Sequence, residues 1–229
     1  MPMKKSVLIV ISFLLFMMAA CSSETTEEQI QGHLEEAVSL EKDFEEQQSK
    51  ITELEKQEQE LYSKIINLGM DEMDKIKELS GQAIDSIEKR SEAIKTEKAS
   101  IEKAEEEFAE TEDLIAEIED EKLKETATSM TEVMQQRYET YHQLNDAYKN
   151  ALALEKEMYN MLQKEDLEQE TLTQQINEIN ESYQKVIDLN NSFNEHTVDY
   201  NEQKKAFYEQ AGMEVNYEKN PTGNKSKEE

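Results

Sequence analysis

The chain has 229 residues, with 53 acidic against 25 basic side chains and a formal net charge of −28. A surface this acidic repels nucleic-acid phosphates, so we expect no nucleic-acid partner. Five glycines and two prolines are too few for the turns of a sheet-rich protein, and the many Glu, Lys, Gln, Leu and Ala residues favour an all-α fold.

The amino-terminal segment has the pattern of an export signal. Lys4 and Lys5 precede a largely apolar run at positions 6–18. Such a run is too short to span a bilayer comfortably as a helix, but it has the length of a signal-peptide core. We therefore predict a lipoprotein signal peptide over residues 1–20.

The end of this segment resembles a bacterial lipobox. It reads Met18-Ala19-Ala20-Cys21, with Met18 where the usual pattern has leucine. The resemblance implies cleavage between Ala20 and Cys21 and attachment of acyl chains such as palmitate to Cys21, which would hold the protein on the outer face of the cell membrane. The alternative is a secretory signal with an incidental cysteine, but the chain has no second cysteine. Residues 21–26 are then the lipidated cysteine and a tether.

Residues 27–212 carry apolar side chains at heptad spacing in four stretches of similar length. Equal stretches joined by short turns predict a four-helix up-and-down bundle over residues 27–212. The alternative is an extended coiled coil that pairs with a second copy. Residues 213–229 are polar and are expected to form a disordered tail.

The predicted breaks between the helices rest on signals of unequal strength. Gly69 suits a left-handed helix cap, and Asp71 suits the start of the next helix. The charged segments 119–121 and 164–168 interrupt the heptad pattern without glycine or proline. Gly212 is expected to close the last helix.

Five charged residues fall on or near the apolar seams. They could form a buried ionic network that fixes the register of the helices. They could instead extend along the edges of a wide seam into water, which is the interpretation we favour. These residues are Arg90, Glu97, Arg137, Glu155 and Lys204.

The sequence contains few residues in patterns typical of catalytic or metal-binding sites. It has no G-x-x-x-x-G-K, H-E-x-x-H or C-x-x-C motif. Glu139 and His142 form one E-x-x-H, a spacing that di-iron helical bundles use twice, but neither His33 nor His196 completes a second one. We predict no metal, no cofactor and no catalytic residue.

Tyrosines cluster in the second half of the chain. Aromatic side chains on a helix can stack on sugar rings, but at helical spacing they more often belong to the core, and we favour the core. The ligand-binding residues cannot be assigned from this spacing. The tyrosines concerned are Tyr138, Tyr141, Tyr148, Tyr159, Tyr183 and Tyr200.

Several short motifs resemble the YkyA-type cell-wall-binding lipoproteins of Gram-positive bacteria. They are QRYE at 136–139, AYKNAL at 147–152, INESY at 179–183 and KKAFYEQAG at 204–212. The resemblance implies a four-helix bundle held outside the membrane in contact with the wall. It supplies no catalytic residues.

Together these observations predict a non-enzymatic, lipid-anchored surface protein whose partner is a wall polymer or a wall-associated protein. The high acidity opposes direct attraction to anionic wall polymers unless cations bridge the two. The alternative is an acidic scaffold or sensor module that binds a cationic envelope protein.

Overall fold

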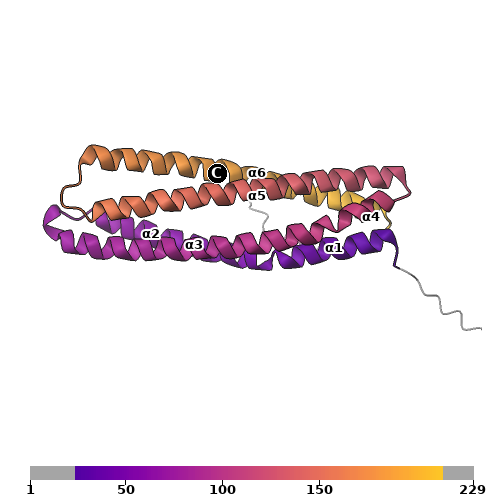
Figure 1. Ribbon diagram of the computed structural model, residues 1–229, viewed down its shortest axis with the longest axis horizontal. Coiled ribbons are helices and arrows are strands. Elements are labelled where there is room, and N and C mark those ends of the chain that lie inside the picture. Colours follow the sequence, from indigo (N-terminus) through magenta and orange to yellow (C-terminus); the bar gives the residue numbers. More distant parts are fainter. Residues whose placement is uncertain (1–23, 214–229) are drawn as a thin grey trace, which may run out of the picture.

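The computed structural model describes residues 24–213 and is all-α, as predicted. The chain forms four antiparallel rods that lie along one long axis (Figure 1). The signal peptide, Ala20, Cys21 and all but the first residue of the predicted tail lie outside the described residues. The elements are α1 (Thr26–Leu40), α2 (Lys42–Ile65), the 3₁₀ turn η1 (Met70–Glu72), α3 (Met73–Ala109), α4 (Thr111–Glu117), α5 (Glu121–Leu162) and α6 (Gln169–Gln210).

The rods pack within a single chain, so the alternative of an open, extended coiled coil is wrong. Helices α1 and α2 form the first rod, α3 and α4 form the second, and α5 and α6 are single long helices (Figure 1). Helix α5 packs against both α3 and α6. Its 42 residues give a rod about 63 Å long at 1.5 Å per residue.

Two of the predicted breaks involve glycine, and they differ in outcome. Gly212 has a φ of +70° and the amide of Met213 donates to the carbonyl of Tyr208, so it closes α6 as predicted. The prediction for Gly69 is wrong, because its φ is −87° and it precedes η1. Helix α2 has already ended at Ile65. The charged segments 119–121 and 164–168 do coincide with the last two breaks.

The first rod is interrupted at Glu41, where the sequence predicted a continuous helix. Ser100 of α3 fills the interruption: its hydroxyl donates to the carbonyl of Leu40 at 2.5 Å and accepts from the amide of Phe44 at 3.2 Å. A side chain from another rod thus supplies the hydrogen bonds that the helix gives up. The second rod is also interrupted, at Glu110 before α4, and there the hydroxyl of Thr111 donates locally to the carbonyl of Phe108.

The core divides into two clusters along the bundle. One is rich in aromatic rings and lies between α1, α4, the end of α3, the first half of α5 and the second half of α6. The other is mainly aliphatic and lies between α2 and the remaining halves of α3, α5 and α6. Two buried polar residues, Glu97 on α3 and Asn145 on α5, occupy the chain positions between these clusters, and the exposed Gln48 of α2 donates to Glu97.

Candidate functional site: the cleft between α2 and α6

A cleft of about 750 Å³ opens between α2 and α6 in the half of the bundle that contains the aliphatic cluster. Helices α2 and α6 make no close backbone contact, so α3 and α5 form the floor. A volume of this size is in the range of small-molecule and peptide sites. The apolar walls are formed by Tyr62, Met158, Ile176, Ile179, Val186 and Ile187.

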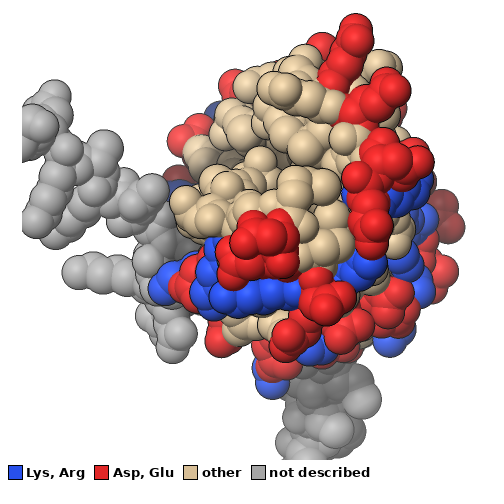
Figure 2. Space-filling view, turned by 90° about the vertical axis from the view of Figure 1, so that its left-hand side faces the viewer, with Lys and Arg blue, Asp and Glu red and all other residues tan. Residues whose placement is uncertain are grey.

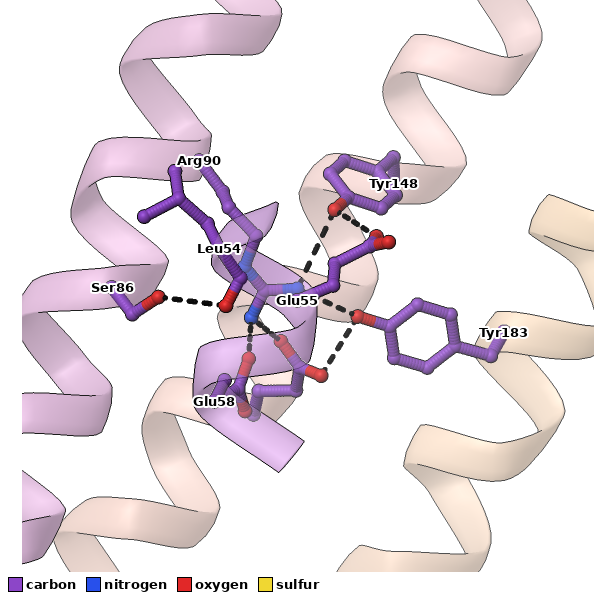
Figure 3. A network of polar contacts seen from close by, with 8 residues as sticks. Leu54, Glu55, Glu58, Ser86, Arg90, Tyr148 and Tyr183 are labelled. Carbon is purple, nitrogen blue, oxygen red and sulfur yellow. Dashed lines mark hydrogen bonds and ion pairs between the residues drawn. The ribbon is translucent and has the colours of Figure 1, made fainter. Parts of the chain in front are cut away.

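The floor of the cleft is organised around the guanidinium of Arg90, on α3 (Figure 3). Nη2 donates to carboxylate oxygens of Glu58 on α2 and of Glu155 on α5, the latter at 2.6 Å. Nη1 donates to the hydroxyls of Tyr183 at 3.1 Å and Tyr148 at 3.4 Å. One side chain therefore links α3 to the three other rods.

The two tyrosines pass these hydrogen bonds on to further carboxylates. Tyr183 donates to Oε1 of Glu155 at 2.7 Å, and Tyr148 donates to Oε1 of Glu55 at 2.5 Å (Figure 3). Burial raises the pKa of both hydroxyls above the ordinary value, so they remain neutral donors. Glu55 is half-buried and is the carboxylate of this network that solvent reaches most easily.

The burial of this network corrects our interpretation of the charged seam residues. Arg90 is 1% exposed, Glu58 6% and Glu155 7%, and Glu97 and Arg137 are buried as well. These residues form buried polar contacts and do not extend into water. The reason is that each has a partner on another rod, which offsets part of the cost of removing the charge from water.

Arg137 is a buried charge whose partner lies on another rod, at the interruption of the first rod. Its guanidinium makes a two-pronged contact with Glu41, at 2.7 and 2.6 Å, and lies 4.5 Å from the ring centre of Phe193. Lys204 is an intermediate case, because its side chain is only 13% exposed while its ammonium pairs at 3.2 Å with Glu35, whose carboxylate is half-exposed.

Burial shifts the acid–base properties of the cleft floor. Burial, and then the charge of Glu155, raise the pKa of Glu58 to about 7, although Arg90 lowers it. Burial also raises the pKa of Glu155. Burial alone would lower the pKa of Arg90, but the carboxylates of Glu155 and Glu58 outweigh that effect and keep the guanidinium charged.

The charges that line the cleft do not cancel. Three glutamates, at positions 55, 58 and 155, face the two cations Arg90 and Lys56, which leaves an excess of one negative charge when all are ionised. Lys56 is exposed on the rim. Around the buried floor itself, Arg90 alone therefore balances the carboxylates.

The E-x-x-H motif does not assemble a metal centre. His142 Nε2 lies 2.8 Å from Oε2 of Glu105 on α3. Within residues 24–213, no group of three or more His, Cys, Asp or Glu side chains is arranged to hold a metal ion. The motif borders a smaller depression of about 480 Å³ between α3 and α5.

The tyrosines of the second half divide between core and cleft. Tyr138, Tyr141, Tyr159 and Tyr200 are buried, as the core interpretation predicted. Tyr148 is buried too, although it also lines the cleft together with Tyr159 and the half-buried Tyr183.

Glu55 and Glu58, which the structure places at the centre of the site, were not predicted from the sequence. Glu58 occupies the heptad position between Leu54 and Leu61, where the first seam has a gap. That gap was the available signal. It is weak, because glutamate is frequent on every face of these helices.

Comparison with known proteins identifies the family. A sequence model of the YkyA family, described as "Putative cell-wall binding lipoprotein", matches residues 25–210. The chain belongs to the YkyA family. It is also 36% identical over 109 residues to the "Uncharacterized lipoprotein YkyA" of Bacillus subtilis (strain 168), an alignment that covers 48% of this chain and 49% of that protein. The chain thus matches about half the length of this YkyA protein.

The fold recurs in a solved structure. A crystal structure of a conserved protein of unknown function from Staphylococcus aureus superposes with a TM-score of 0.71, over 80% of this chain and 93% of that one. The two sequences are 17% identical, so the likeness concerns the fold alone.

Among residues 24–213, no helix of this YkyA member is long and apolar enough to cross a membrane.

Proposed function

We propose that this protein is a non-enzymatic lipoprotein of the outer cell surface that binds cell-wall material through the cleft between α2 and α6. The observation that carries the proposal is the match of residues 25–210 to a family described as cell-wall binding, in a chain whose cleft between α2 and α6 has buried charged side chains in its floor. The lipobox at residues 18–21 supports the anchoring.

The arrangement of the cleft floor favours binding over catalysis. Glu58 and Glu155 both hold the guanidinium of Arg90, so neither carboxylate is free to act on a substrate. The raised pKa of Glu58 follows from burial and from its neighbour Glu155, and structural ion-pair networks produce the same shift as active sites do.

The uneven distribution of charge over the surface reduces the electrostatic repulsion expected between this acidic protein and anionic wall polymers. Figure 2 shows the molecule from the end that carries the α2–α3 turn and the α5–α6 loop. Uncharged residues cover much of the upper part of this view, while acidic and basic side chains mix over the lower part. A wall component can therefore approach this end without crossing a continuous acidic surface.

The test is retention of the mature, detergent-extracted protein on purified cell walls. We expect walls stripped of their proteins to retain it, with or without added calcium or magnesium. Filling the cleft by Asn180→Trp, on its exposed rim, should reduce retention. Retention by stripped walls that is unaffected by Asn180→Trp would contradict the assignment to the cleft.

A second candidate function rests on the net charge of −28. An acidic scaffold would bind a cationic envelope protein through long-range attraction. Retention that disappears when wall proteins are stripped, and that weakens steeply with added salt, would favour this candidate.

A further inference from the structure

We propose that the ligand of the cleft is a short extended peptide bearing a primary amine, whose ammonium group pairs with Glu55 while its aliphatic part packs against the isoleucines of α6. The inference rests on the proposed function, because it names the chemistry of the wall component that the same cleft would bind. Three properties of the cleft lead to it.

The first property is charge. Glu55, Glu58 and Glu155 outnumber the two cations that line the cleft, and Glu55 is the one of the three that pairs with neither cation among the described residues. Arg90 is already shared between the two buried carboxylates. Glu55 receives a hydrogen bond from Tyr148, which holds its carboxylate in place at the half-buried edge of the floor. A ligand cation would give Glu55 the ionic partner that it lacks among the described residues, in a setting where water screens the pair only partly.

The second property is the character of the walls. Ile176, Ile179 and Ile187 of α6 line the cleft, and Ile187 is 52% exposed. Aliphatic walls beside a carboxylate suit a charged group carried on a methylene chain, as in a lysine-type side chain. They do not suit a bare metal ion, which would need several oxygen ligands around it.

The third property is length. The cleft follows α2 from Thr52 to Tyr62 and α6 from Ile176 to Ile187, which corresponds to about 15 Å at 1.5 Å per residue. An extended peptide rises about 3.3 Å per residue, so four or five residues span this distance. A single amino acid would leave most of the cleft empty.

The experiment measures binding of two synthetic pentapeptides to the mature, detergent-extracted protein by isothermal titration calorimetry. One peptide has a central lysine with a free amine, and the other has the same lysine acetylated on Nζ. We expect acetylation to weaken binding at least tenfold. We expect Glu55→Gln to weaken binding of the free-amine peptide about tenfold and Asn180→Trp to abolish it.

The matched control is Glu53→Gln, because Glu53 is an exposed glutamate on the same helix that does not line the cleft. It removes the same charge from the protein and should leave binding unchanged. Equal weakening by Glu53→Gln and Glu55→Gln would show a general effect of acidity and would overturn the proposal. Equal binding of the free and acetylated peptides would also overturn it.

Wall fragments with free and with acetylated amines separate this inference from the proposed function. Fragments that bind equally well in both forms, and equally to the Glu55→Gln variant, leave wall binding intact but overturn the amine ligand. Peptide binding through Glu55 without retention on walls supports the inference, overturns the proposed function and points to the basic segment of a protein as the source of the amine. Tighter binding of free-amine fragments supports both.

Discussion

At the scale of single residues, Arg90 carries the most unusual balance of forces in the molecule. It is 1% exposed, and its Nε is buried without a hydrogen-bond partner among the described residues. Removing a guanidinium from water is costly, and only the contacts with Glu58, Glu155, Tyr148 and Tyr183 offset that cost. Such a network adds little net stability while it is intact, yet the loss of one partner leaves charges buried and unpaired.

Replacing Arg90 by methionine should therefore be strongly destabilising. Glu58 and Glu155 would be left facing each other, and we expect a loss of about 3–5 kcal/mol in the free energy of unfolding at pH 7.5. The loss should shrink at pH 5.5, where the two carboxyl groups take up protons more readily. Urea unfolding followed by circular dichroism measures both values.

The control for Arg90→Met combines it with Glu58→Gln and Glu155→Gln. This triple variant has no buried charge on the cleft floor and should recover much of the lost stability. If the single variant is as stable as the triple variant, the carboxylates are not confined as described.

Glu97 is a buried carboxylate that pairs with no cation within residues 24–213. Gln48 donates to it at 2.6 Å, and burial raises its pKa from 4.5 to about 7, with a further contribution from the charge of Glu55. The folded state then holds the proton more tightly than the unfolded state. The resulting stabilisation is complete below pH 4.5 and is lost as the pH rises through 7.

We therefore expect Glu97→Gln to raise the stability at pH 7.5 by an amount on the order of 2 kcal/mol and to flatten the dependence of stability on pH between 5 and 7.5. Melting temperatures of the wild type and the variant at several pH values provide the measurement. Parallel curves for the two proteins would mean that Glu97 does not titrate in this range.

At the scale of elements, the rods are held together by side chains that donate to backbone carbonyls of a neighbouring rod. Ser86 donates to Leu54, Asn145 to Ile94 and Gln175 to Leu154. Ser100 differs from these because Leu40 and Phe44 flank an interruption, and their backbone groups rely on its hydroxyl.

Ser100→Ala should consequently cost more than Ser86→Ala. The first leaves a carbonyl and an amide without this partner, and we expect a loss of about 1–3 kcal/mol. The second removes a bond to the carbonyl of Leu54, which lies inside α2 and retains its helical partner, so the loss should be about 1 kcal/mol or less. Chemical unfolding of the two variants side by side tests the difference, and equal losses would contradict it.

The sequence predicts the elements whose signals are local, but not the features that depend on contacts between distant residues. The four rods follow from heptad spacing, and the cap at Gly212 follows from the conformational freedom of glycine. The interruption at Glu41 has no such local mark, because its hydrogen bonds come from Ser100, sixty residues away from Leu40. Glu58 was missed for a related reason: burial of a glutamate depends on Arg90, and the sequence does not show that the two meet.

At the scale of the whole molecule, the start of α1 and the proposed binding cleft lie far apart along the first rod. Helix α1 begins at Thr26, and Glu58 follows 32 residues later, which places the cleft about 48 Å along the first rod. A lipid at Cys21 would hold the start of α1 near the membrane and carry the cleft outward.

Cys21→Ser should release the protein from the membrane without unfolding it. Without acyl chains, the attachment that we propose is lost, and the protein should move from the membrane fraction to the soluble fraction of the envelope. Cell fractionation shows the shift, and mass spectrometry of the wild type shows whether the chain begins at a modified Cys21. Unchanged membrane association of the variant would refute the anchor.

Thr25, at the start of the first rod, and Gly212, at the end of the fourth, border the same pocket as Asp120 in the turn after α4. Because the four rods are antiparallel, the end of α6 lies at the same end of the bundle as the start of α1. A bead, biosensor chip or fluorescent label attached close to Thr25 or close to Gly212 therefore lies at the same pole and directs the opposite pole outward. Coupling close to Gly212 would present the bundle in the orientation that the proposed lipid anchor implies, and it would leave Cys21 unmodified.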